Sequence, residues 1–324
     1  MTSTVDSSPA TWVDYTPPGL FASVMGIAGL GLAWRKAHEV IGVQQFIGEI
    51  ILLLAAAVFA VVATLYGIKA LRGSAQFKSD MVHPVRANFV PAATIGMLLL
   101  STAVLPYSRI AGELLWILGT AGDLFLAIRI IRRWLGEPYE INTVNASWFI
   151  PVVGNIIVPI SGMRLGYVET SWMLFSFGLV FWILLFTIVL YRKLFHDPIP
   201  AKLMPTVAIL VAPPAIGFVS YMALNGGQID ALARILYYVA LLLAVIVVSL
   251  FPKLVKIPFG LPWWAYTFPM DALAIASLIY AGATGAPGVE MVASIALALA
   301  TLINIWVGYK TLRAIQGGHV FVPE

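Results

Sequence analysis

The chain has 324 residues, of which 60% are hydrophobic and only 10% are charged, and its mean hydropathy is +0.93. Soluble domains carry roughly 25% charged residues, so this composition indicates an integral membrane protein and excludes a chain made mainly of soluble domains. The absence of cysteine excludes disulfides, thiol chemistry and iron–sulfur clusters. The net charge of +4 is not gathered in a basic, aromatic-rich patch, so no nucleic-acid partner is expected.

Ten apolar stretches of membrane-crossing length follow one another along the chain. About 20 apolar residues cross the hydrocarbon core, so ten stretches with short connections use nearly all of the sequence. We therefore predict an all-α integral membrane domain at 18–313, flanked by terminal segments at 1–17 and 314–324. Residues 1–17 lack a basic segment, so no secretory signal is expected. The stretches are Gly19–Trp34, Glu49–Lys69, Phe89–Leu105, Ala111–Ile131, Trp148–Met163, Trp172–Tyr191, Leu203–Leu224, Ala231–Leu250, Trp263–Tyr280 and Val289–Leu312.

Helix breakers occur in alternate stretches. The third, fifth, seventh and ninth stretches contain proline, the first is rich in glycine, and the other five contain no proline. Proline removes a helical hydrogen bond that hydrocarbon cannot replace, so a bent helix must be sheltered by protein or by a water-filled cavity. We therefore expect the odd-numbered helices inside and the even-numbered helices facing lipid. The candidate bends are Gly26, Pro91, Pro151, Pro213 and Pro269.

The breakers recur at intervals of about one helical hairpin. Five hairpins of the same polarity predict five quasi-equivalent units around an axis along the membrane normal, with a central space between them. The alternative is that proline is simply more frequent in membrane helices. The bends either shape a pore, where exposed backbone groups can coordinate ions, or only permit close helix packing.

Loop charge predicts the orientation. With ten crossings, both termini share one side with the loops after the even-numbered stretches, and most lysines and arginines lie there. Only Arg35, Lys36, Arg109 and Arg164 lie in the loops of the other side. The positive-inside rule therefore places both termini in the cytoplasm.

The odd-numbered stretches contain a single charged residue, Asp271. The chain has no HExxH, P-loop, GxSxG or CxxC motif, and its four histidines lie in loops or in the C-terminal tail. We therefore predict neither an enzyme nor a metal or cofactor site. A conduit lined by small and aromatic residues, which passes a solute without holding it, fits this composition better.

Several short motifs occur in a fixed order. They are Pro18-Gly19-Leu20-Phe21 with the glycine-rich run Gly26 to Trp34, His83-Pro84-Val85-Arg86, Ala212-Pro213, and Trp263-Trp264-Ala265-Tyr266-Thr267-Phe268. From about Pro17 to Arg313 the chain resembles the tellurite-resistance and dicarboxylate transporter family, which includes bacterial TehA and the plant slow-type anion channels. The resemblance implies ten helices as five tandem hairpins around a pore, and a homotrimer with one pore in each subunit. Activities known in that family are chloride or nitrate conduction, sulfite efflux, malate transport and tellurite resistance.

The resemblance and the local sequence together suggest the site residues. Phe268 matches the phenylalanine that occludes the pore in the family, and the following Pro269 disfavours a regular helix there, although the ring could instead be a packing residue. Asp271 departs from the family's usual apolar or hydroxyl residue. It is either hydrogen-bonded to a neighbouring helix or a proton-coupling or gating carboxylate. Asn155 either offers an N–H to an anion or pairs between helices.

The expected function is an anion channel that passes small inorganic anions, chloride and nitrate, through a pore occluded by Phe268. The alternative is a proton-coupled C4-dicarboxylate transporter, or a sulfite or tellurite-resistance exporter, coupled through Asp271. The absence of catalytic motifs argues against a membrane-bound enzyme, and the lack of room for a soluble domain argues against a sensor scaffold.

Overall fold

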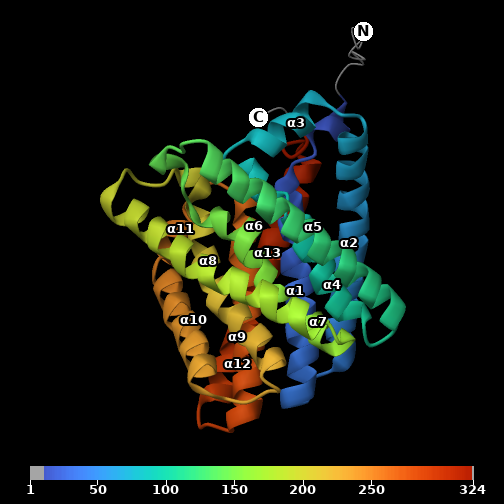
Figure 1. Ribbon diagram of the computed structural model, residues 1–324, viewed down its shortest axis with the longest axis vertical. Helices are drawn as coiled ribbons and strands as arrows, with labels where there is room; N and C mark the ends of the chain where they lie inside the picture. The colour runs from blue at the N-terminus through green and yellow to red at the C-terminus, as the bar shows by residue number, and fades with distance from the viewer. Residues whose placement is uncertain (1–10, 323–324) are drawn as a thin grey trace.

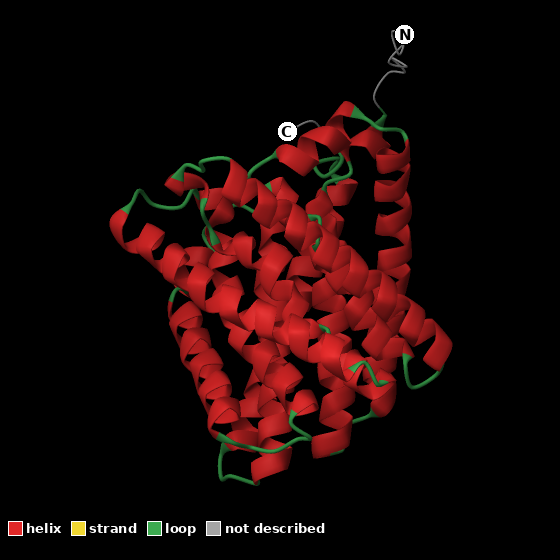
Figure 2. Ribbon diagram, viewed as in Figure 1, coloured by secondary structure: helices red, strands yellow, loops and turns green. Residues whose placement is uncertain are grey.

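The computed structural model describes residues 11–322, and every regular element among them is a helix (Figure 2). The five stretches without a helix breaker form α2 (Gln45–Leu71), α5 (Arg109–Gly136), α8 (Val168–Phe195), α10 (Ala231–Ser249) and α13 (Val289–Gln316). The other α-helices are α1 (Phe21–Ile41), α3 (Ala75–Val82), α4 (Ala92–Val104), α6 (Ile150–Val153), α7 (Pro159–Leu165), α9 (Ala212–Leu224), α11 (Phe251–Leu254) and α12 (Thr267–Thr284). Short 3-10 helices are η1 (Trp12–Tyr15), η2 (Pro18–Leu20), η3 (Arg86–Phe89), η4 (Ile141–Thr143), η5 (Ala146–Phe149), η6 (Gly154–Ile157), η7 (Ala201–Val211) and η8 (Leu261–Tyr266).

Eight helical stretches of the described chain are long and apolar enough to cross a membrane, and each coincides with a predicted stretch. The prediction of an all-helical, multi-pass membrane protein is therefore confirmed. Helices α1 and α12 are not among the eight. Arg35 and Lys36 lower the mean hydropathy of α1, and Pro269 and Asp271 lower that of α12.

Burial separates the stretches with proline from those without it. In the three that contain Pro91, Pro151 and Pro213, 78–89% of the most apolar window is buried inside the protein, against 22–33% in the other five. Helix α12, which contains Pro269, is buried almost throughout. This difference agrees with the expectation that helix breakers lie on sheltered helices, because hydrocarbon cannot satisfy the backbone groups that proline leaves unpaired.

Four prolines of the inner stretches lie where a 3-10 helix changes into an α-helix. Pro91 directly precedes α4 after η3, and Pro151 is the second residue of α6 after η5. Pro213 is the second residue of α9 after η7, and Pro269 is the third residue of α12 after η8. In the first turn of an α-helix the backbone N–H has no intrahelical acceptor, so proline loses no hydrogen bond there. Each of these apolar stretches is thus divided into 3-10 and α segments rather than forming one bent α-helix, and the stretch with Pro151 contains four such segments, η5, α6, η6 and α7.

Helices that are consecutive in the chain pack in pairs, α1 with α2, α4 with α5, α7 with α8, α9 with α10 and α12 with α13. The inner helices also contact one another. Helix α4 packs against α1 and α7, α9 packs against α7 and α12, and α12 returns to α1. Because α12 contacts α1, the first and last inner helices of the chain lie next to each other. Figure 1 shows the outer helices α2 and α10 on opposite sides of the molecule.

Both ends of the described chain lie at the end of the molecule that carries α3 (Figure 1). There the rings of Trp12 and Phe321 meet edge to face, with their centroids 5.5 Å apart. An even number of membrane crossings places both ends on the same side, as this arrangement requires.

Candidate functional site

A narrow cavity of about 60 Å³ lies among the inner segments. Every stretch that carries a helix breaker contributes to its wall, whereas none of the long outer helices α2, α5, α8, α10 or α13 does so. One lining residue from each of the five inner stretches is Met25, Ile95, Phe149, Pro213 and Phe268. The lining contains no charged side chain. A cavity of this size holds a few water molecules by volume, at about 10–15 Å³ for each, but its wall offers them almost no polar partner.

Phe268 is the second residue of α12 and is 6% exposed. Its ring rests against Gly29 of α1, where an added Cβ would come within 3.1 Å of ring atom Cδ2. Trp264 and Ala265, one turn earlier, line the same wall. The indole Nε1 of Trp264 donates a hydrogen bond to Thr311 Oγ1 on α13 at 3.0 Å. This part of the wall is therefore aromatic, and its indole donor is engaged by an outer helix.

The predicted bends contribute to the cavity unequally. Pro213 and Pro269 line it, whereas Gly26, Pro91 and Pro151 do not. Gly26 does not interrupt α1, which runs through it as a continuous α-helix. A Cβ on Gly26 would lie 2.2 Å from Thr267 Oγ1, so this glycine permits close contact between α1 and α12.

Asp271 is fully buried and does not line the cavity. Its Oδ1 accepts a hydrogen bond from Asn304 Nδ2 on α13 at 2.9 Å. Its Oδ2 faces Gly29, where an added Cβ would approach to 3.0 Å, and has no hydrogen-bond partner among the described residues. The structure thus contains the hydrogen bond to a neighbouring helix that the first interpretation of Asp271 requires.

Asn155 in η6 is also buried outside the cavity lining, although its neighbour Gly154 belongs to that lining. The side-chain Nδ2 of Asn155 donates to the carbonyl oxygen of Val152 at 3.1 Å. A contact between Asn155 and an anion therefore stays a prediction.

Sequence reasoning missed the buried position of Asp123, which it placed on a lipid-facing helix. The side chain is fully buried, and its Oδ1 accepts a hydrogen bond from Thr94 Oγ1 at 2.8 Å, joining α5 to α4. Its Oδ2 lies close to Gly154, where an added Cβ would be 3.4 Å away. A lone carboxylate in an apolar stretch was the available signal, because such a group is costly in contact with lipid.

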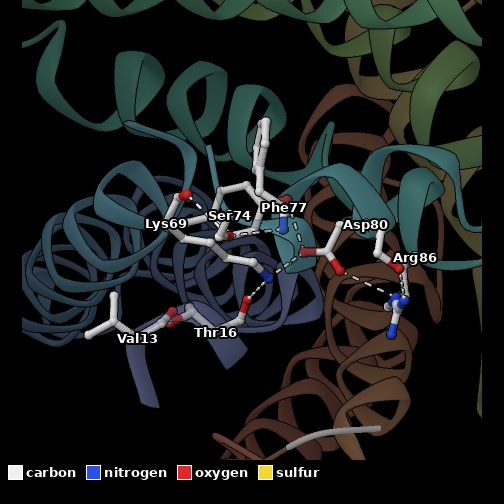
Figure 3. Close-up of polar contacts among 9 residues, drawn as sticks. Val13, Thr16, Lys69, Ser74, Phe77, Asp80 and Arg86 are labelled. Carbon is white, nitrogen blue, oxygen red and sulfur yellow. Dashed lines mark hydrogen bonds and ion pairs between the residues drawn. The ribbon is translucent and has the colours of Figure 1, made fainter. Parts of the chain in front are cut away.

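An ionic network lies at the end of the molecule that carries α3 (Figure 3). Lys69, near the end of α2, is 2% exposed and donates to Asp80 Oδ2 at 2.5 Å and to the carbonyl oxygen of Thr16 at 2.9 Å. Asp80 Oδ1 lies 3.3 Å from Nε of Arg86, the first residue of η3. Phe89, the last residue of η3, lines the cavity. The network therefore connects the N-terminal segment and α3 to a segment that reaches the cavity.

We expect Asp80→Ala to destabilise the protein by about 3–5 kcal/mol, because it leaves the buried ammonium of Lys69 without a carboxylate. The midpoint of thermal unfolding in detergent measures this effect. A matched control is Glu39→Ala, which breaks the exposed ion pair with Lys36 and is expected to change stability little. Equal effects of the two substitutions would show that the Lys69–Asp80 pair does not stabilise the fold as proposed.

Residues 15–312 match the profile of a family described as voltage-dependent anion channel. A tellurite resistance protein TehA homolog from Haemophilus influenzae is 25% identical over 301 residues, which cover 92% of this chain and 90% of the relative. The uncharacterized transporter MJ0762 from Methanocaldococcus jannaschii is 25% identical over 330 residues, covering 93% and 95%. The S-type anion channel SLAH2 from Arabidopsis thaliana is 25% identical over 313 residues, covering 94% of this chain but 59% of the longer plant protein.

Proposed function

Because the chain belongs to the voltage-dependent anion channel family, we propose that it is a channel for small monovalent anions such as chloride and nitrate. Relatives of the chain are named as anion channels and as transporters. The observation that carries the proposal is the central cavity, to which every inner stretch contributes and which contains no charged side chain. A wall without charges gives a passing anion no strong binding site, so the anion is not held on its way.

In this proposal Phe268 is the gate. Its ring lies in the wall of a cavity of about 60 Å³, so a hydrated anion cannot pass beside it without losing water. An anion sheds its hydration only where polar groups replace it, and apolar rings do not. The closed path is therefore blocked both by the volume of the ring and by the cost of dehydration. Pro213 and Pro269 line the same cavity as the ring.

The architecture that goes with this function has ten crossings, arranged as five helical hairpins with quasi-fivefold symmetry around the cavity. The closed sequence of contacts from α1 through α4, α7, α9 and α12 back to α1 supports this arrangement. We infer that both termini are cytoplasmic, because the loops on their side carry most of the lysines and arginines. From the resemblance we further infer a homotrimer. Each subunit would contain its own conduit, since one chain lines the whole cavity.

Anion flux from liposomes tests the proposal. Purified protein in vesicles should release chloride and nitrate down their gradients at equal pH on both sides, and valinomycin with potassium should supply the compensating charge. Flux that requires a proton gradient would contradict the channel and favour a carrier.

The second candidate function is a proton-coupled carrier for C4-dicarboxylates or an exporter of sulfite, for which Asp271 would be the coupling group. It is favoured by one observation, the buried Oδ2 of Asp271 that has no partner among the described residues. Channel and carrier can share a fold, so the architecture does not distinguish them.

We expect Asp271→Asn to leave anion flux nearly intact and its pH dependence unchanged. The side chain does not line the cavity, and an amide oxygen can still accept the hydrogen bond from Asn304. Liposome flux across a range of pH values measures both quantities. Asp123→Asn, which alters the fully buried carboxylate that joins α5 to α4, is the matched control. Loss of proton-driven uptake in Asp271→Asn alone would support the carrier.

A further inference from the structure

A second pocket of about 20 Å³ lies between η3 and the last turns of α5. Its lining includes Arg129 and Arg133, which are one helical turn apart on α5, together with His83 and Asn88. No carboxylate belongs to this lining. A volume of this size accommodates a single small group such as a water molecule or an anionic oxygen. The pocket therefore concentrates positive charge around a space that one anionic group can enter.

The two arginines differ in how they are held. Arg133 is fixed, since its Nη1 donates to the carbonyl oxygen of Val82 at 2.5 Å and its guanidinium lies over the ring of Tyr139 at 5.6 Å. Its carboxylate neighbour Glu137, at 3.5 Å, has a side chain that is 67% exposed. Arg129 is exposed, and no ion pair joins it to a carboxylate of residues 11–322. One guanidinium is thus preorganised, and the other is available to close on a ligand.

The surroundings of the pocket suit the boundary between hydrocarbon and water. The outer face of α5 exposes Phe125 and Ile128 just before the arginines, as a lipid-facing surface does. Trp134 lines the pocket and stacks on Trp148, with ring centroids 4.7 Å apart. The indole Nε1 of Trp148 is buried and has no acceptor among the described residues. Aromatic rings and arginines gather at the depth of lipid headgroups, where basic pockets between helices hold phosphate groups.

The pocket is also linked to the cavity. Asn88 Nδ2 donates to Ser147 Oγ at 3.3 Å and to the carbonyl oxygen of Pro84 at 3.1 Å, so it joins η3 to η5. The residues Phe89 and Phe149 of these two segments line the cavity. A ligand in the pocket therefore contacts η3, which lines the cavity and is hydrogen-bonded to η5.

We propose that this pocket binds a phosphate group through Arg129 and Arg133, supplied either by the headgroup of a phospholipid with net negative charge or by free phosphate. The planar guanidinium donates two parallel hydrogen bonds to phosphate oxygens, which explains a site built from arginine without a carboxylate. Binding stabilises the contact of η3 with η5 and does not depend on whether the cavity conducts anions.

The midpoint of thermal unfolding tests the proposal on the full chain in a zwitterionic detergent. The added probes are short-chain phosphatidylglycerol, phosphatidylcholine and inorganic phosphate. Phosphatidylglycerol should raise the midpoint of the native protein and of Arg132→Gln, because Arg132 lies on the same helix end but does not line the pocket. In Arg129→Gln the concentration of phosphatidylglycerol that gives half of the full shift should rise about tenfold, as expected for the loss of one charge-assisted hydrogen bond. Arg133→Lys keeps the positive charge but loses the planar guanidinium that donates two parallel hydrogen bonds, so it should also weaken binding.

The outcomes separate the sources of the phosphate. A shift with phosphatidylglycerol alone supports the site with lipid as the ligand, and a shift with inorganic phosphate as well supports the site with free phosphate as sufficient. The proposal is overturned if no anionic probe shifts the midpoint, if phosphatidylcholine shifts it equally, or if Arg129→Gln and Arg132→Gln respond alike. The last result would mean that the arginines act only through general surface charge.

Discussion

Phe268→Ala should raise chloride and nitrate currents severalfold or more, with little loss of folded protein. The ring occupies part of the wall of a cavity of about 60 Å³, so its removal enlarges the space along the proposed path. The change also removes an apolar surface that opposes hydration of the path. The cost in stability should be small, because a side chain that faces a lumen has fewer packing partners than one in a closed core. Patch-clamp recording of vesicles that contain equal amounts of each protein measures the ratio of currents.

Two controls separate gating from a general loosening of the helices. Phe268→Leu keeps apolar bulk in the cavity and should leave the current low. Phe218→Ala removes a fully buried ring that does not line the cavity. It should lower stability by about 3–5 kcal/mol without raising the current. Unchanged currents in well-folded Phe268→Ala would falsify the gate and leave Phe268 as a packing residue.

The second large effect is expected from Gly26→Ala, which should strongly destabilise the contact of α1 with α12. The added Cβ would lie 2.2 Å from Thr267 Oγ1 and 2.7 Å from Thr267 Cβ. The Cβ of Thr267 is fixed to the backbone of α12, so the helices must separate. Overpacking of this kind costs about 1–3 kcal/mol or more. The yield of monodisperse protein and the midpoint of thermal unfolding report the loss.

Gly308→Ala is the matched control, because a Cβ added at Gly308 on α13 would have no atom within 4 Å. Alanine is favoured over glycine inside a helix by roughly 0.5–1 kcal/mol, so this variant should be as stable as the native protein or more so. Gly26→Ala combined with Thr267→Gly should recover part of the lost stability. If Gly26→Ala has the same midpoint of thermal unfolding as the native protein, α1 and α12 do not pack as closely as described.

Much of the fold could be predicted from the sequence because hydrocarbon penalises every unpaired backbone group. That penalty restricts Pro91, Pro151 and Pro213 to sheltered stretches, and the alternation of proline along the chain therefore predicts burial correctly. The division of these stretches into 3-10 and α segments was not predictable in the same way. Proline is compatible with a kink inside a helix and with its first turn, and only the surrounding packing decides between them.

The site was predicted only in part. Phe268, Pro213 and Pro269 line the cavity, and the resemblance or the helix-breaking residue suggested each of them. Met25 and Ile95 line it equally, yet nothing in an apolar stretch distinguishes a side chain that faces a cavity from one that faces a helix. Polar residues, in contrast, are easy to recognise in an apolar stretch.

Asp271 and Asn155 stand out in an apolar stretch, but both hydrogen-bond to neighbouring groups outside the cavity lining. A buried polar group needs a partner wherever it lies, so its presence alone does not place it at a functional site.

Single-channel recording tests the central claim most directly, because a channel and a carrier differ in the number of ions that pass per conformational cycle. Purified native protein and Phe268→Ala would be reconstituted in planar bilayers with chloride and equal pH on both sides. The account predicts discrete chloride-selective openings, which are rare or small in the native protein and frequent or large in Phe268→Ala. An absence of unitary currents in both proteins, together with anion uptake driven by a proton gradient in liposomes, would contradict it.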